Sequence, residues 1–152
     1  MTSPEEIIKI ADTRLEEAKL LLENKHYSGA FYLAGYSVEL YLKAKICKVF
    51  AIPNLFEDKS KSKDKNNSED GMGDIRKAVK IHKLANLLLF SGLKPKYDCL
   101  GVTNPKMLFN ISFLIKEWNE QERYKPNNPI HYIKIENTLN NLKEFLEWIQ
   151  NN

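Results

Sequence analysis

Apolar residues recur at helical spacing in the opening segment of the chain. They are Ile7, Ala11, Leu15, Ala18 and Leu22. Steps of three and four residues place them on one face of a helix, which is the face that a core would cover. Ser3, Pro4 and Glu6 have the residue types of a helix start, because serine caps, proline suits the first turn and glutamate completes a capping box. The pattern therefore predicts a helix from this start to about Glu23.

The next helical segment, residues 27–50, is apolar on more than one face. Such a helix is expected at the centre of a bundle, where neighbours cover it on several sides. Its small residues include Gly29, Ala34 and Gly35, which favour close approach of those neighbours. Because only the polar residues 24–26 separate this segment from the first helix, we expect the two helices to pack as an antiparallel pair.

The middle of the chain alternates between polar and helical patterns. Residues 57–73 are polar, mixed in charge and contain a single apolar side chain, so they are predicted to be a flexible insertion. Asp74 is then predicted to cap a helical segment over residues 75–90, with a break near His82. Residues 93–104 are predicted to form a second loop.

The end of the chain carries two more helical patterns. Asn104-Pro105 begins the first and Asn128-Pro129 begins the second, and residues 123–128 are predicted to connect them. The last helix has a heptad-like apolar seam formed by Ile135, Leu139, Leu142, Leu146 and Ile149.

These elements predict an all-α fold, because no segment shows the strict alternation of a strand. Short connections favour antiparallel neighbours, so we expect an up-and-down four-helix bundle with one extra short helix. The chain has 152 residues, an ordinary size for one domain. Residues 1–152 are therefore predicted to form a single domain that contains the insertion at about 57–73.

Charge and cysteine content narrow the class of protein. The net charge is +3, from 23 basic and 20 acidic residues, which lacks the strong basic excess of most nucleic-acid binders but leaves local basic patches open. Cys47 and Cys99 form no C-x-x-C pair or disulfide framework, so a reducing compartment is expected. With no signal-peptide pattern and no apolar stretch of membrane-spanning length, a cytoplasmic protein is predicted.

The sequence lacks the common motifs that bind phosphate groups or metal ions. Its glycines are scattered and form no phosphate-binding loop. His26, His82 and His131 lie on separate segments without the spacing of metal ligands. We therefore predict no metal site and no cofactor.

Two sets of charged residues are candidates for a site. Glu39 and Lys43 stand four residues apart in the most apolar helix, with the acid first, which suits a helical ion pair. Charged pairs are usually solvated, so a surface pair is the favoured reading, and a partly buried Glu39 held for a specific partner is the alternative. Arg123 and His131 flank the last connector, where they could act on a phosphodiester, histidine as acid or base and arginine as charge stabiliser. For both residues, a solvated or helix-capping role is the favoured reading, and the catalytic role is the alternative.

Four short patterns along the chain share an order and a set of residue types. The first is the hairpin over residues 18–30, in which a helix ends and a tyrosine precedes a helix rich in small residues. The others are the Glu39–Lys43 pair, His82 two residues before a leucine, and Arg123-Tyr124 shortly before a proline. Taken in order, they resemble the HEPN family (higher eukaryote and prokaryote nucleotide-binding domains).

The resemblance implies a HEPN-like four-helix bundle that forms a homodimer. Many members pair with a minimal nucleotidyltransferase in toxin–antitoxin or defence modules. Others are metal-independent ribonucleases with an arginine and a histidine at the dimer cleft, for which Arg123 and His131 are the candidates here. Seven residues separate these two, more than in the family's nuclease motif. Arg123-Tyr124 resembles instead the branch without nuclease activity, in which Arg123 would pair with Glu39 inside the bundle.

The sequence therefore favours a non-catalytic module that binds a nucleotide, a nucleic acid such as RNA, or a nucleotidyltransferase partner. Its expected polar cluster consists of Glu39, Lys43, His82, Arg123 and Tyr124. A metal-independent ribonuclease that uses Arg123 and His131 at a dimer cleft is the alternative. A purely structural or interaction protein is a further alternative.

Overall fold

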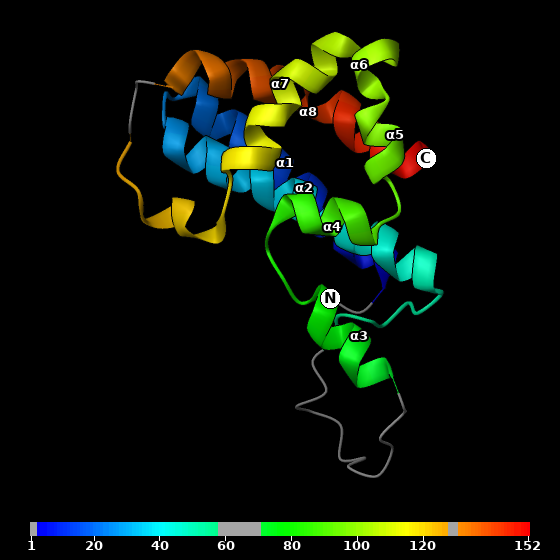
Figure 1. The fold of residues 1–152 in the computed structure, drawn as a ribbon. Coiled ribbons are helices and arrows are strands. Elements are labelled where there is room, and N and C mark those ends of the chain that lie inside the picture. The colour runs from blue at the N-terminus through cyan, green and yellow to red at the C-terminus, as the bar shows by residue number, and fades with distance from the viewer. Residues whose placement is uncertain (1–2, 58–70, 128–130) are drawn as a thin grey trace.

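The computed structural model describes residues 3–57, 71–127 and 131–152, and Figure 1 shows the fold. Within these ranges every regular element is a helix, so the all-α prediction is confirmed. The elements are α1 (Pro4–Glu23), α2 (Tyr27–Phe50), α3 (Met72–Val79), α4 (Leu84–Phe90), α5 (Lys94–Asp98), α6 (Leu100–Thr103), α7 (Pro105–Glu117), the 3₁₀ helix η2 (Glu120–Tyr124) and α8 (Tyr132–Asn151).

The four long helices, α1, α2, α7 and α8, form the bundle (Figure 1). The predicted bounds of α1 and α2 are confirmed, and the Ser3 capping box is present, with the Ser3 hydroxyl accepting from Glu6 N and the Glu6 carboxylate accepting from Ser3 N. The apolar seam of α8 is buried along its whole length. No helix in the described ranges has an apolar stretch long enough to cross a membrane.

Helix α2 is central, as its pattern predicted. It packs against α1, α4, α7, α8 and η2, so charged as well as apolar side chains on it are withdrawn from water. Gly35 faces Trp118, which follows α7, at a distance that leaves no room for a side chain on residue 35. The Trp118 indole N–H donates to Tyr32 O at 3.0 Å, which holds the end of α7 against α2.

The prediction of a loop over residues 93–104 is wrong, because this segment contains α5 and α6. Its missed signal is helical spacing within a short run: Leu93, Tyr97 and Leu100 are all buried, at 2%, 8% and 2% exposure. Steps of four and three residues place them on one face. Pro95 within this run, and Gly92 and Gly101 on either side of it, obscured the pattern in the sequence.

Three other boundaries differ from expectation or lie outside the described residues. Helix α3 begins before Asp74 and has Gly71 at its N-cap, so the predicted cap is wrong, whereas the break near His82 is confirmed between α3 and α4. The expected connector contains the 3₁₀ helix η2. Most of the predicted insertion at 57–73, and the predicted start at Asn128-Pro129, fall on residues outside the described ranges.

The predicted start of α7 is confirmed and offers a test of the capping argument. The Asn104 side chain accepts from Met107 N at 3.2 Å and donates to a Glu144 carboxylate oxygen at 2.6 Å, which also ties α7 to α8. We expect Asn104→Ala to lower the free energy of unfolding by about 1 kcal/mol, measured by urea denaturation. Asn104→Ser keeps a capping oxygen and should recover part of that loss; equal stability of all three proteins would contradict the role of the cap.

Candidate functional site

Glu39 lies at the centre of a buried charged cluster. One of its carboxylate oxygens accepts a hydrogen bond from the Lys43 ammonium at 2.5 Å. The two carboxylate oxygens of Glu39 lie 3.0 and 3.1 Å from His82 Nδ1. The side chains of Glu39 and Lys43 are 2% and 9% exposed, whereas that of His82 is 51% exposed. We call these three residues the Glu39 cluster.

The favoured reading of Glu39 and Lys43 as a solvated surface pair is wrong. Their i, i+4 spacing is the same in a surface pair and in a buried one, and only the central position of α2 withdraws them from water. The Lys43 ammonium also lies 5.5 Å from the centroid of the Phe56 ring, a favourable cation–π distance. Burial raises the pKa of the nearby Tyr36 phenol, and the negative charge of Glu39 raises it further.

The expected pair of Glu39 with Arg123 is not formed. Glu39 is satisfied by Lys43 and His82, and the exposed Arg123 guanidinium lies 4.8 Å from the centroid of the Tyr124 ring. The physical reason is the orientation of η2, which turns Glu122 inward and leaves Arg123 and Tyr124 on its outer side.

A pocket lies at the end of the bundle where α2 begins, α7 ends and α8 begins. Its volume is about 300 Å³. We call it the end pocket. Its described lining residues are Ser28, Phe31, Phe113, Glu117, Glu122, Lys125, Pro126, His131 and Ile135.

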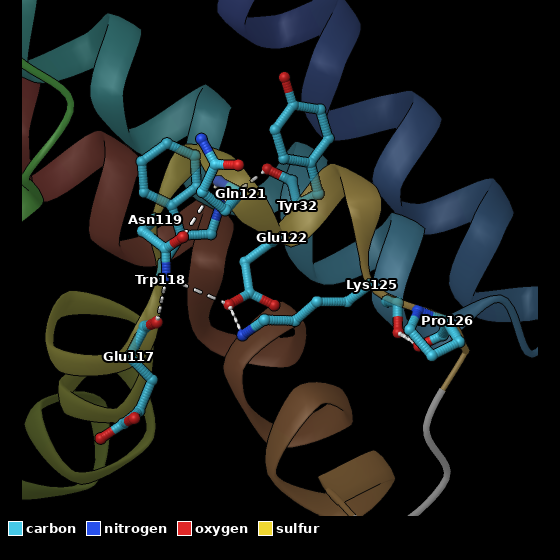
Figure 2. Close-up of polar contacts among 9 residues, drawn as sticks. Tyr32, Glu117, Trp118, Asn119, Gln121, Glu122, Lys125 and Pro126 are labelled. Atoms are coloured by element: carbon cyan, nitrogen blue, oxygen red, sulfur yellow. Dashed lines mark hydrogen bonds and ion pairs between the residues drawn. The ribbon is translucent and has the colours of Figure 1, made fainter.

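Helix η2 places a buried carboxylate in this pocket. The Asn119 side chain caps η2 by accepting from Gln121 N at 3.0 Å, and it donates to the Glu122 carboxylate at 3.3 Å. The same Glu122 oxygen accepts from the Lys125 ammonium at 2.5 Å. Figure 2 shows Lys125 extended back along η2 to reach Glu122. The Glu122 side chain is 9% exposed, whereas that of Lys125 is 56% exposed, so the carboxylate is buried and its cationic partner stays in contact with water.

The segment after η2 is tied to the turn between α1 and α2. Asn127 Oδ1 accepts from Tyr27 N at 2.9 Å, and its amide nitrogen donates to Lys25 O at 3.1 Å. The Ser28 hydroxyl donates to Pro126 O at 2.7 Å. These contacts bring together residues about a hundred positions apart, which explains why sequence reasoning missed Asn127. Glu122 has only local hydrogen-bond partners and was missed because its polar setting along the chain is ordinary.

His131 reaches the end pocket, and Arg123 does not line it. His131 is the N-cap residue of α8, and its ring centroid lies 6.0 Å from that of Phe113. Phe113 in turn lies 5.2 Å from the Phe31 ring, so three rings form one wall. The structure therefore gathers His131 with Glu122 and Lys125, while Arg123 lies outside the described lining.

Metal-binding side chains do not gather in the part of the chain that is described. Over residues 3–57, 71–127 and 131–152, no group of three or more His, Cys, Asp or Glu side chains is placed to hold a metal ion.

Comparison with protein families identifies the first helical hairpin. The family model for the HEPN domain matches residues 4–54, which comprise α1, α2 and the turn after α2 and contain Glu39 and Lys43. The match covers about a third of the chain, and over these residues it confirms the family predicted from the sequence. The match ends before His82, Arg123 and His131, whose roles stay predictions. Comparison with curated proteins and with solved structures gives no match.

Proposed function

We propose that the chain is a non-catalytic HEPN module that binds a nucleotide, alone or as part of a nucleic acid, with the base in the end pocket. The observation that carries this proposal is the composition of the pocket wall. Aromatic rings from α2, α7 and the start of α8 stand beside two carboxylates that can accept hydrogen bonds.

The charges in the pocket suit a base better than a phosphate. Glu117 and Glu122 can accept hydrogen bonds from the ring and exocyclic N–H groups of a base, and the Phe113 ring supplies a stacking surface. A phosphate in the same place would face two negative charges. Lys125, 56% exposed at the side chain, is at the rim, where a phosphate outside the pocket could meet its ammonium group.

The same arrangement disfavours the ribonuclease alternative. Cleavage of a phosphodiester would need Arg123 and His131 on one phosphate, whereas Arg123 stacks on Tyr124 outside the described lining of the pocket. Glu117 and Glu122 line the pocket that His131 enters, and their charges would raise the free energy of a dianionic transition state there. The homodimer and the nucleotidyltransferase partner that the family resemblance implies stay predictions, as does placement in a toxin–antitoxin or defence system.

Nucleotide binding and RNA cleavage can be measured on the same protein. We expect AMP, GMP, CMP or UMP to bind in isothermal titration calorimetry, because the pocket offers both stacking and acceptors. His131→Ala and Glu117→Ala should each weaken the best of these about tenfold, since each removes one direct contact. A labelled RNA incubated with the wild-type protein in EDTA should stay intact.

Arg123→Ala is the matched control, because Arg123 is exposed and outside the described lining. It should bind the nucleotide as the wild type does. RNA cleavage in EDTA that Arg123→Ala abolishes would overturn the proposal in favour of the ribonuclease. Absence of binding by all four nucleotides and by a single-stranded oligonucleotide would also overturn it.

A further inference from the structure

A groove continues from the end pocket along the outer face of α7. Two further hollows lie there, and neighbouring hollows share residues: the first shares Phe113 and Glu117 with the end pocket, and the second shares Phe109, Ser112 and Lys116 with the first. The three hollows therefore form one track. We call the part beyond the end pocket the α7 groove.

The α7 groove exposes an aromatic ring that a folded core would normally bury. Phe109 is 78% exposed, although it lies in the middle of α7. Phe113 follows it by one helical turn and is half-buried, so two rings stand in line along the groove. Exposed rings in a row are the platform on which unstacked bases bind, because every base has a face that can stack.

Two lysines flank these rings. Lys116 borders both hollows of the α7 groove, and Lys134 reaches across from α8, with its ammonium 5.3 Å from the Phe113 centroid. Neither lysine makes an ion pair with another residue in the described parts of the chain. Their positive charge is therefore available to a ligand. The two lysines form a local basic patch, which is compatible with the small net charge of the chain.

Amide side chains complete the lining. Asn137 on α8 borders the groove and is exposed. Asn110 donates its amide N–H to Asn141 Oδ1 at 2.5 Å, which orients the Asn110 side chain and leaves its own oxygen as an acceptor. Amides of this kind offer donors and acceptors to the edges of bases.

We propose that the α7 groove binds single-stranded nucleic acid, with one base in the end pocket against Phe113, the next base against Phe109, and the backbone phosphates beside Lys116 and Lys134. This inference rests on the proposed function and names the ligand that the same site takes. A single strand fits better than a duplex, because bases within a duplex are stacked on one another and cannot lie against protein rings. An acidic peptide would pair with the lysines but would not use the aromatic rings and the amide side chains together.

Fluorescence anisotropy with a labelled single strand of about ten nucleotides tests this directly, using an RNA and the DNA of the same sequence. Phe109→Ala should weaken binding about tenfold by removing one stacking surface. The double variant Lys116→Gln/Lys134→Gln should weaken binding as well. It should also reduce the slope of log affinity against log salt by about 1.4, since two phosphate contacts are lost.

The matched controls lie on α1 and at the end of α2. Leu20→Ala shortens another exposed apolar side chain, 59% exposed, and Lys9→Gln/Lys48→Gln removes two exposed lysines; both should bind as the wild type does. All of these positions are exposed, so circular dichroism and light scattering are expected to show folded proteins of unchanged mass.

Two results would overturn the inference and leave the proposed function intact. One is that a mononucleotide binds in the end pocket while the single strand binds no more tightly and is insensitive to the α7 groove variants. The other is that Phe109→Ala converts a dimer to a monomer without changing affinity for the strand, which would assign this face to a second copy of the chain. Failure of every nucleotide and strand to bind would instead overturn the proposed function itself.

Discussion

Gly35→Ala is expected to lower the free energy of unfolding by about 3 kcal/mol, an unusually large loss for the addition of one methyl group. A Cβ at this position would lie 2.2 Å from Trp118 Cδ1 and 2.3 Å from two further indole atoms. The indole is 4% exposed and donates a hydrogen bond to Tyr32 O, so it cannot move aside without breaking that bond. The loss should appear in urea denaturation although alanine favours a helix over glycine by about 1 kcal/mol.

Gly101→Ala is the matched control for this substitution. A Cβ there would meet only Leu108 Cδ2, at 3.7 Å, which is ordinary van der Waals contact, so stability should be unchanged or slightly increased. Combining Gly35→Ala with Trp118→Phe should cost less than the two single losses added together, because the smaller ring leaves room for the methyl group. Wild-type stability of Gly35→Ala would show that α2 and the end of α7 are not packed as described.

Glu39→Gln is expected to cost about 3 kcal/mol, because it leaves the Lys43 ammonium buried without its counter-charge. The substitution preserves the shape of the side chain, so the loss reports on charge rather than on packing. His82 is half-exposed and can turn to water, whereas the Lys43 side chain is 9% exposed and cannot do so without moving the residues around it. Urea denaturation measures the change.

Lys94 and Asp98 provide a matched control pair. They have the same i, i+4 spacing and the same 2.5 Å separation between charged atoms as Glu39 and Lys43, but their side chains are 40% and 57% exposed. Asp98→Asn should therefore cost no more than about 0.5 kcal/mol. The double variant Glu39→Leu/Lys43→Met should be more stable than Glu39→Gln, since an apolar pair leaves no buried charge. Equal losses at the two sites would mean that Glu39 is hydrated.

The long helices were predictable because their evidence is local. Helical periodicity, the Ser3 capping box and the Asn104 cap each depend on residues within a few positions of one another, and the seam of α8 repeats over about four turns. The family was recognisable for a related reason: the matched hairpin over residues 4–54 is continuous in sequence. Helices α5 and α6 were missed because each is only about one turn long, too short for a period to emerge.

The candidate site was predictable only in part. Glu39, Lys43 and His82 were named from the sequence and are in contact in the structure. His131 was named as well and lines the end pocket, but its expected partner Arg123 does not. Glu122, whose carboxylate lies in that pocket, was not singled out at all. Nothing in its neighbourhood along the chain distinguishes it from the exposed acids of other segments.

By itself, then, the sequence determined that this protein is all-helical, where its long helices lie and which family its first hairpin resembles, since spacing and capping act over a single turn. Only the tertiary structure decided that Glu39 and Lys43 are buried, that Glu122 rather than Arg123 turns inward, and that Phe109 remains exposed beside Lys116. Burial depends on which helix is central and on what covers each face. Those contacts join residues tens to a hundred positions apart, so they cannot be deduced from the spacing of residues along the chain.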